Sequence, residues 1–78
     1  MEDTIIMYPL VDEATEERAR IALRSSPIHA LRTLQVSCEG DALIISGRVP
    51  TFYYKQLAQE AVRTVIKDVP VVNNIEVD

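Results

Sequence analysis

The hydrophobic positions between residues 42 and 66 follow two different periods, and the rest of the chain is expected to pack around them. Residues 42–46 read Ala-Leu-Ile-Ile-Ser, a short apolar run typical of a buried strand. The Gly-Arg-Val-Pro sequence at 47–50 then predicts a corner. Beyond it, apolar residues recur at helical spacing on one face, with glutamine and arginine opposite. This face comprises Leu57, Ala58, Ala61, Val62, Val65 and Ile66.

A second helix is predicted near the start of the chain. Asp12 is a good N-cap, and the apolar spacing continues to about Ser25, where Ser-Ser-Pro stops the helix. Ile21 falls nearly opposite Leu23 on this helix. Two outcomes are open for Ile21: helix rotation half-buries it, or the N-terminal arm or a partner covers it. The inner face comprises Thr15, Ala19, Ala22, Leu23 and Ser26.

Two prolines mark the approaches to the next segments. Pro27 is well placed to open a short turn, in which Leu31 is expected to reach the core. Pro50 fixes the approach to the later helix, for which Thr51 is the predicted N-cap.

Strict alternation predicts a hairpin before that helix. Residues 34–38 alternate apolar and polar, and Glu-Gly-Asp at 39–41 supplies a tight turn in which Gly40 can take a positive φ. Gly47 lies in the inward row of the returning strand, where its missing side chain would let the following helix approach closely. The hairpin's inward side chains are Leu34, Val36, Cys38, Leu43 and Ile45. A last strand over residues 71–77 points Val71, Ile75 and Val77 inward.

This order predicts an α+β fold, αββαβ, with two helices packed on one face of a three-stranded mixed sheet. Residues 12–78 form this domain. Residues 1–11 form an N-terminal arm or an extra strand, because the apolar run at 5–8 would be poorly tolerated free in water. The opposite face of the sheet carries Ile44 and Val72, which need a cover or a partner.

Composition and residue chemistry favour a binding domain over an enzyme. The 78 residues suffice for one modest core, and an apolar content of 47% excludes disorder. The single cysteine, Cys38, excludes an internal disulfide and a four-cysteine metal site, and its place in the alternating strand indicates a buried small hydrophobe. His29 has no local partner for proton transfer and is expected at the surface. We predict no catalytic residues, no cofactor and no metal site.

Charge is divided unevenly along the chain. Residues 1–17 carry six acids and no base, or −6, whereas residues 18–78 carry eight bases and six acids, or +2. Two interpretations are open: acids and arginines complement the dipole of the first helix, or the arginines between Arg18 and Arg32 form an anion-facing patch. The start lacks the basic region of a signal peptide and no run has transmembrane length, so we expect a cytoplasmic protein, membrane-peripheral at most.

Nucleic-acid binding is not expected. The chain lacks the GxxG loop of KH modules, and the open face of the predicted sheet lacks the aromatic residues on which bases stack. The net charge of −4 also opposes binding to phosphates.

Taken together, these motifs resemble the BON domain family, named after bacterial osmotic-shock-induced and nodulation proteins. The most specific parts are Gly47 within the Leu-x-Ile-Ser-Gly-x-Val run at 43–49 and the Val-Val-Asn-x-Ile-x-Val ending at 71–77. The resemblance covers residues 12–77. It implies a non-enzymatic domain that binds phospholipid or other envelope components. The chain departs from the family pattern at 67–70, where a glycine is common before the last strand, and this should alter only the turn.

Two functional hypotheses follow. In the first, Phe52 and Tyr53, with the cations Arg48 and Lys55 close in sequence, form a surface for anionic lipid. The alternatives for the two aromatic residues are that they fold back to complete a small core, or that they contact a protein partner. In the second hypothesis, the chain is a homodimer or a protein-interaction module. Its interface residues would be Ile5, Ile6, Ile21, Ile44 and Val72.

Overall fold

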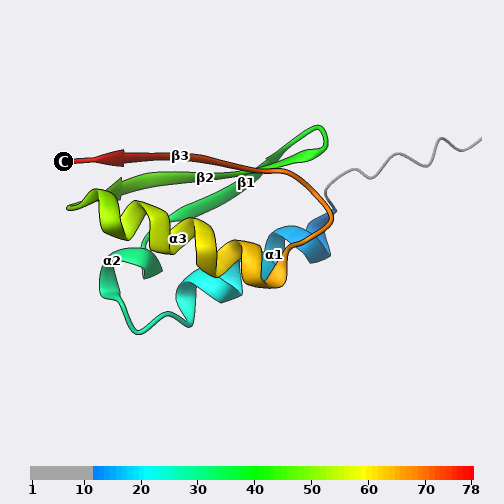
Figure 1. Ribbon diagram of the computed structural model, residues 1–78. Coiled ribbons are helices and arrows are strands. Elements are labelled where there is room, and N and C mark those ends of the chain that lie inside the picture. The colour runs from blue at the N-terminus through cyan, green and yellow to red at the C-terminus, as the bar shows by residue number, and fades with distance from the viewer. Residues whose placement is uncertain (1–11) are drawn as a thin grey trace, which may run out of the picture.

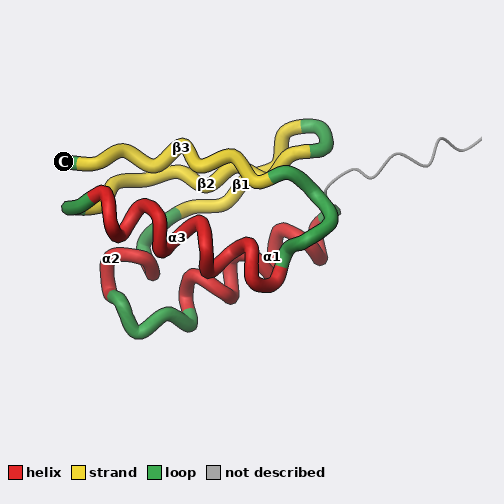
Figure 2. The backbone as a smooth tube through the Cα atoms, in the orientation of Figure 1, coloured by secondary structure: helices red, strands yellow, loops and turns green. Residues whose placement is uncertain are grey.

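Three strands form one mixed sheet, and the helices lie on one of its faces (Figures 1 and 2). The computed structural model describes residues 12–78, so the expected arm or strand, with Ile5 and Ile6, lies outside the described residues. The α+β class and the αββαβ order are confirmed, with one further helical turn, α2, after the first helix. The elements are α1 (Glu13–Arg24), α2 (His29–Arg32), β1 (Gln35–Glu39), β2 (Ala42–Val49), α3 (Phe52–Val65) and β3 (Val71–Val77).

The two long helices start where their capping residues predict. The Asp12 carboxylate accepts a hydrogen bond of 2.8 Å from the backbone N–H of Thr15. The Thr51 hydroxyl oxygen accepts one of 3.1 Å from the N–H of Tyr54. Each bond satisfies one of the N–H groups that a helix leaves without an internal partner in its first turn.

The central strand is longer than the sequence predicts. β2 pairs antiparallel with β1 and parallel with β3, and the parallel pairing continues to Val49 opposite Val77. The Asp78 N–H then donates to the Val49 carbonyl at 3.0 Å. The predicted corner at 47–50 is therefore wrong up to Val49, because the parallel partner extends the ladder through Gly47 and Arg48.

Gly47 lies in a tight place, but its neighbour is not the helix. Its φ is +130°, a conformation that residues with a side chain rarely adopt. A Cβ atom here would lie 2.7 Å from Cδ2 of Leu34. The glycine thus makes room for Leu34 at the entry to β1, and the expectation that it admits the following helix is wrong.

An aliphatic core fills the space between the sheet and the helices. The predicted inward row holds for Leu43 and Ile45, both fully buried, while Cys38 is partly buried against the core. Val65 and Val77 were expected inside, yet each is 38% exposed because it is the last residue of its element. The buried residues are Ala19, Leu23, Leu31, Leu34, Val36, Leu43, Ile45, Val49, Ala58, Val62, Ile66 and Ile75.

Candidate functional site

Two aromatic side chains project from the first turn of α3. Phe52 is 61% exposed and Tyr53 is 64% exposed. The neighbouring Tyr54, whose ring centroid lies 6.1 Å from that of Tyr53, is the aromatic residue that packs partly against the core. The alternative in which Phe52 and Tyr53 complete a small core is therefore wrong: Tyr54, Ala58 and the next turns of α3 face the sheet instead.

Two cations lie at the same end of the domain. Lys55 belongs to the same helical turn as the aromatic pair, and Arg32 is on α2, which contacts α3 and lies beside its N-terminal turns (Figure 1). Arg32 is exposed, and its Nη2 lies 3.3 Å from Nδ1 of His29, itself exposed as expected. Within residues 12–78, neither cation forms an ion pair.

Arg48 points to the other side of the sheet and is already paired. It lines a shallow polar hollow on the face that the described helices leave open, together with Glu76. Its guanidinium donates to Glu76 Oε1 at 2.7 Å and to Asp78 Oδ1 at 2.9 Å. The hydrogen bond to Asp78 and the charges of both carboxylates raise the pKa of Arg48 above its usual value. Arg48 therefore lies on the opposite face of the sheet from α3, the helix that bears Phe52 and Tyr53.

The apolar residues expected at a subunit interface separate into two surfaces. Ile44 and Val72 are opposite each other in the ladder of β2 and β3, on the open face of the sheet, where Ile44 is half-buried and Val72 is 45% exposed. Ile21 is 52% exposed on α1, in the helical layer. A single flat interface can therefore include the Ile44–Val72 pair or Ile21, but not all three.

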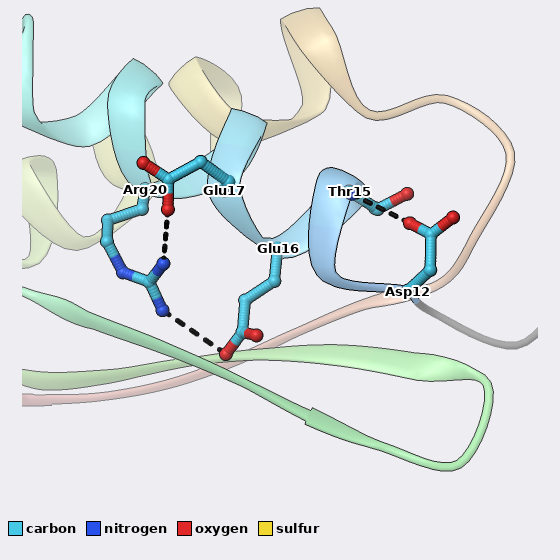
Figure 3. A network of polar contacts seen from close by, with 5 residues as sticks. All are labelled: Asp12, Thr15, Glu16, Glu17 and Arg20. Carbon is cyan, nitrogen blue, oxygen red and sulfur yellow. Dashed lines mark hydrogen bonds and ion pairs between the residues drawn. The ribbon is translucent and has the colours of Figure 1, made fainter.

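Most of the arginines on α1 bind within the domain. Arg20 pairs with Glu16 at 3.3 Å and with Glu17 at 2.7 Å, as Figure 3 shows. Arg18 Nη2 donates to the Val65 carbonyl at 2.8 Å and so joins α1 to the end of α3. These contacts favour the interpretation that charges on α1 stabilise the helix and its packing, and they leave Arg24 as the α1 cation free of such contacts within the described residues.

The one thiol of the chain is not activated, and the described residues form no metal cluster. Burial raises the pKa of the Cys38 thiol, and the nearby charge of Glu16 raises it further, so the thiol stays protonated and unreactive at neutral pH. Residues 12–78 contain no cluster of three histidine, cysteine or carboxylate side chains suited to a metal ion. Among the helices described, none is both long and apolar enough to cross a bilayer.

Two residues that the sequence interpretation did not place in the lipid surface matter at this end of the domain, although Arg32 was one of the arginines of the possible anion-facing patch. Asn73 occupies an inward position of β3, where its Nδ2 donates to the Lys55 carbonyl at 2.9 Å and to Gln59 Oε1 at 3.1 Å. A polar residue in the inward row of an alternating strand is a signal that could have revealed it. No sequence signal could have placed Arg32 in the same way. It directly follows the buried Leu31, but the position of α2 beside α3 depends on how the short turn folds.

Comparison with known proteins gives one family match. The family model described as the BON domain matches residues 12–78, which is most of the chain. None of the curated proteins searched matches the sequence.

Proposed function

Because this chain belongs to the BON domain family, we propose that it is a non-enzymatic binding module that associates with anionic phospholipid surfaces. The family points to a binding domain. The specific ligand, and the residues that contact it, are inferred from the surface at the start of α3.

The observation that carries the proposal is the exposure of Phe52 and Tyr53, consecutive residues in the first turn of α3. More than half of the surface of each residue is accessible to water. The chain has only four aromatic residues, and these two are not used to fill its core. Aromatic rings are favoured at the level of lipid headgroups: the apolar ring of Phe52 can enter the interface, and the hydroxyl of Tyr53 can stay hydrated while its ring enters. Lys55 in the same turn adds the positive charge that anionic headgroups attract.

Arg48 has a weaker place in this proposal than Lys55. Its charge is offset by Glu76 and Asp78, and a lipid phosphate would have to replace one of these carboxylates. We expect the aromatic pair and Lys55 to provide most of the binding.

The test compares Phe52→Ser with Val72→Ser. Both changes remove an exposed apolar side chain, but Val72 lies on the open face of the sheet. We expect Phe52→Ser to weaken partition into vesicles containing phosphatidylglycerol about tenfold, from the loss of apolar contact with the interface. Val72→Ser should leave partition unchanged, and the melting temperatures of both variants should stay within a few degrees of the parent. Equal partition of the two variants would refute the role of Phe52.

The same pair of variants addresses the alternative function, a self-assembly module. Ile44 and Val72 adjoin on a sheet face that no described element covers, and burying them against a second copy would stabilise a dimer. In that case light scattering would give a dimer mass for the parent and a smaller mass for Val72→Ser, with Phe52→Ser unaffected.

A further inference from the structure

The cations of the domain are not equally available to an external anion. Arg18 and Arg20 bind within the helical layer, and Arg48 is held between two carboxylates. The remaining cations have no ion pair within the described residues. They are Arg24, Arg32, Lys55, Arg63 and Lys67.

Of these, Arg32 lies on α2, which contacts α3. Leu31 is 2% exposed and holds this single turn to the core, so the adjacent Arg32 is carried on an anchored element although its own side chain is exposed. α2 lies beside the N-terminal turns of α3, the turns that bear Phe52 and Tyr53 (Figure 1). By contrast, Arg63 lies in the last turn of α3, toward the opposite end of the helix.

Much of the acidic charge lies away from this end of the domain. The acidic first turn of α1 and the turn between β1 and β2 lie at the far end of the domain (Figure 1). Glu76 and Asp78 are at the near end, but both engage Arg48 and reduce the charge of that cluster to −1.

From this arrangement we infer that Arg32 is a second headgroup-binding residue, and that the domain meets an anionic membrane end-on through α2 and the first turn of α3. The inference rests on the proposed function. A guanidinium offers several donors to a phosphate, which suits the phosphodiester and any further anionic group of the lipid. The open face of the sheet then stays clear of the membrane.

The experiment measures partition into vesicles of phosphatidylcholine with phosphatidylglycerol for the parent chain and three variants: Arg32→Gln, Arg32→Lys and Arg63→Gln. Arg63→Gln is the matched control, because it removes the same charge from an exposed helical position away from the aromatic pair. We expect Arg32→Gln to weaken partition about fivefold, as for one basic residue at an anionic surface. Arg32→Lys keeps the charge but not the guanidinium donors, so its partition should lie between those of the parent and Arg32→Gln, and Arg63→Gln should change partition less than about twofold.

The outcomes separate the inference from the function on which it rests. Failure of the parent chain to bind anionic vesicles would overturn both. Binding by the parent with equal losses in Arg32→Gln and Arg63→Gln would overturn the end-on inference alone, because long-range charge would then account for both losses. Unchanged partition for Arg32→Gln would do the same, and melting curves of each variant verify that the domain remains folded.

Discussion

At the scale of single residues, Asp12 couples the start of α1 to pH. Its carboxylate accepts a hydrogen bond from the Thr15 N–H, and this bond is the main reason why its pKa lies below the usual value near 3.8. The folded state therefore binds the proton less tightly than the unfolded chain does. The contribution of the cap to stability is complete above the unfolded pKa and is lost as the pH falls through the lowered pKa of the folded protein.

This difference predicts the behaviour of Asp12→Asn. Asparagine can still cap the helix but does not titrate. Between neutral pH and about pH 3, where aspartate takes up its proton, the melting temperature of the parent should fall further than that of Asp12→Asn, and the gap should open below about pH 4. The remaining carboxylates titrate in both proteins and so cancel in the comparison. Parallel pH curves would contradict an ionised cap.

Gly47 marks the limit of what the sequence reveals about single residues. Its inward position follows from alternation with Leu43 and Ile45, and the structure agrees. That it makes room for Leu34 could not be predicted, because Leu34 reaches Gly47 only once the register of β1 against β2 is set. The exposure of Phe52 could not be predicted either: the sequence left open whether this side chain folds back to complete the core, and that depends on tertiary packing.

At the scale of elements, β3 is an edge strand, and the side chain of Asn73 within it accepts a hydrogen bond from the strand's own backbone. The Ile75 N–H donates to Oδ1 of Asn73 at 3.2 Å, while Nδ2 of Asn73 bonds to α3. The side-chain amide of Asn73 thus satisfies a backbone donor of the edge strand and links that strand to α3. Such a bond also makes the edge less available for pairing with another chain.

Substitution of Asn73 should accordingly cost more than substitution of its neighbour. Asn73→Ala leaves the partly buried Ile75 N–H without its acceptor, and we expect the free energy of unfolding to fall by about 1–3 kcal/mol. Asn74→Ala is the control, because Asn74 is exposed on the open face of the sheet and should change stability by about 0.5 kcal/mol or less. Urea denaturation of both variants measures the difference, and similar stabilities for the two would contradict the linking role of Asn73.

The helices and strands themselves were largely predictable from the sequence. Capping residues located the starts of α1 and α3, and alternation located the hairpin and the last strand. The error at residues 47–50 arose because proline and glycine there resembled a turn, whereas the parallel partner strand, distant in the sequence, determines where β2 ends. Local signals report local structure, and strand length is set by a non-local partner.

At the scale of the whole molecule, the sheet and the helical layer differ in charge, and the two ends of the domain differ in both charge and exposed apolar surface. Arg48 is the one cation on the described strands, and it is neutralised there; the other cations lie on the helices or in the loop after α3. The exposed aromatic pair and two cations without an ion pair among residues 12–78 share one end, and the acidic start of α1 lies at the other (Figure 1). This polarity fits the end-on approach to an anionic surface that we propose, and it could not be predicted before α2 was placed.

Binding of the unmodified chain to vesicles tests the central claim most directly. We would measure its co-sedimentation with vesicles of phosphatidylcholine alone and of phosphatidylcholine with phosphatidylglycerol, over a series of salt concentrations. The account predicts binding to the anionic vesicles that weakens steadily toward about 1 M salt, where the Debye length shrinks to roughly 3 Å. Absence of binding to anionic vesicles at low salt, or equal and salt-independent binding to both kinds, would contradict it.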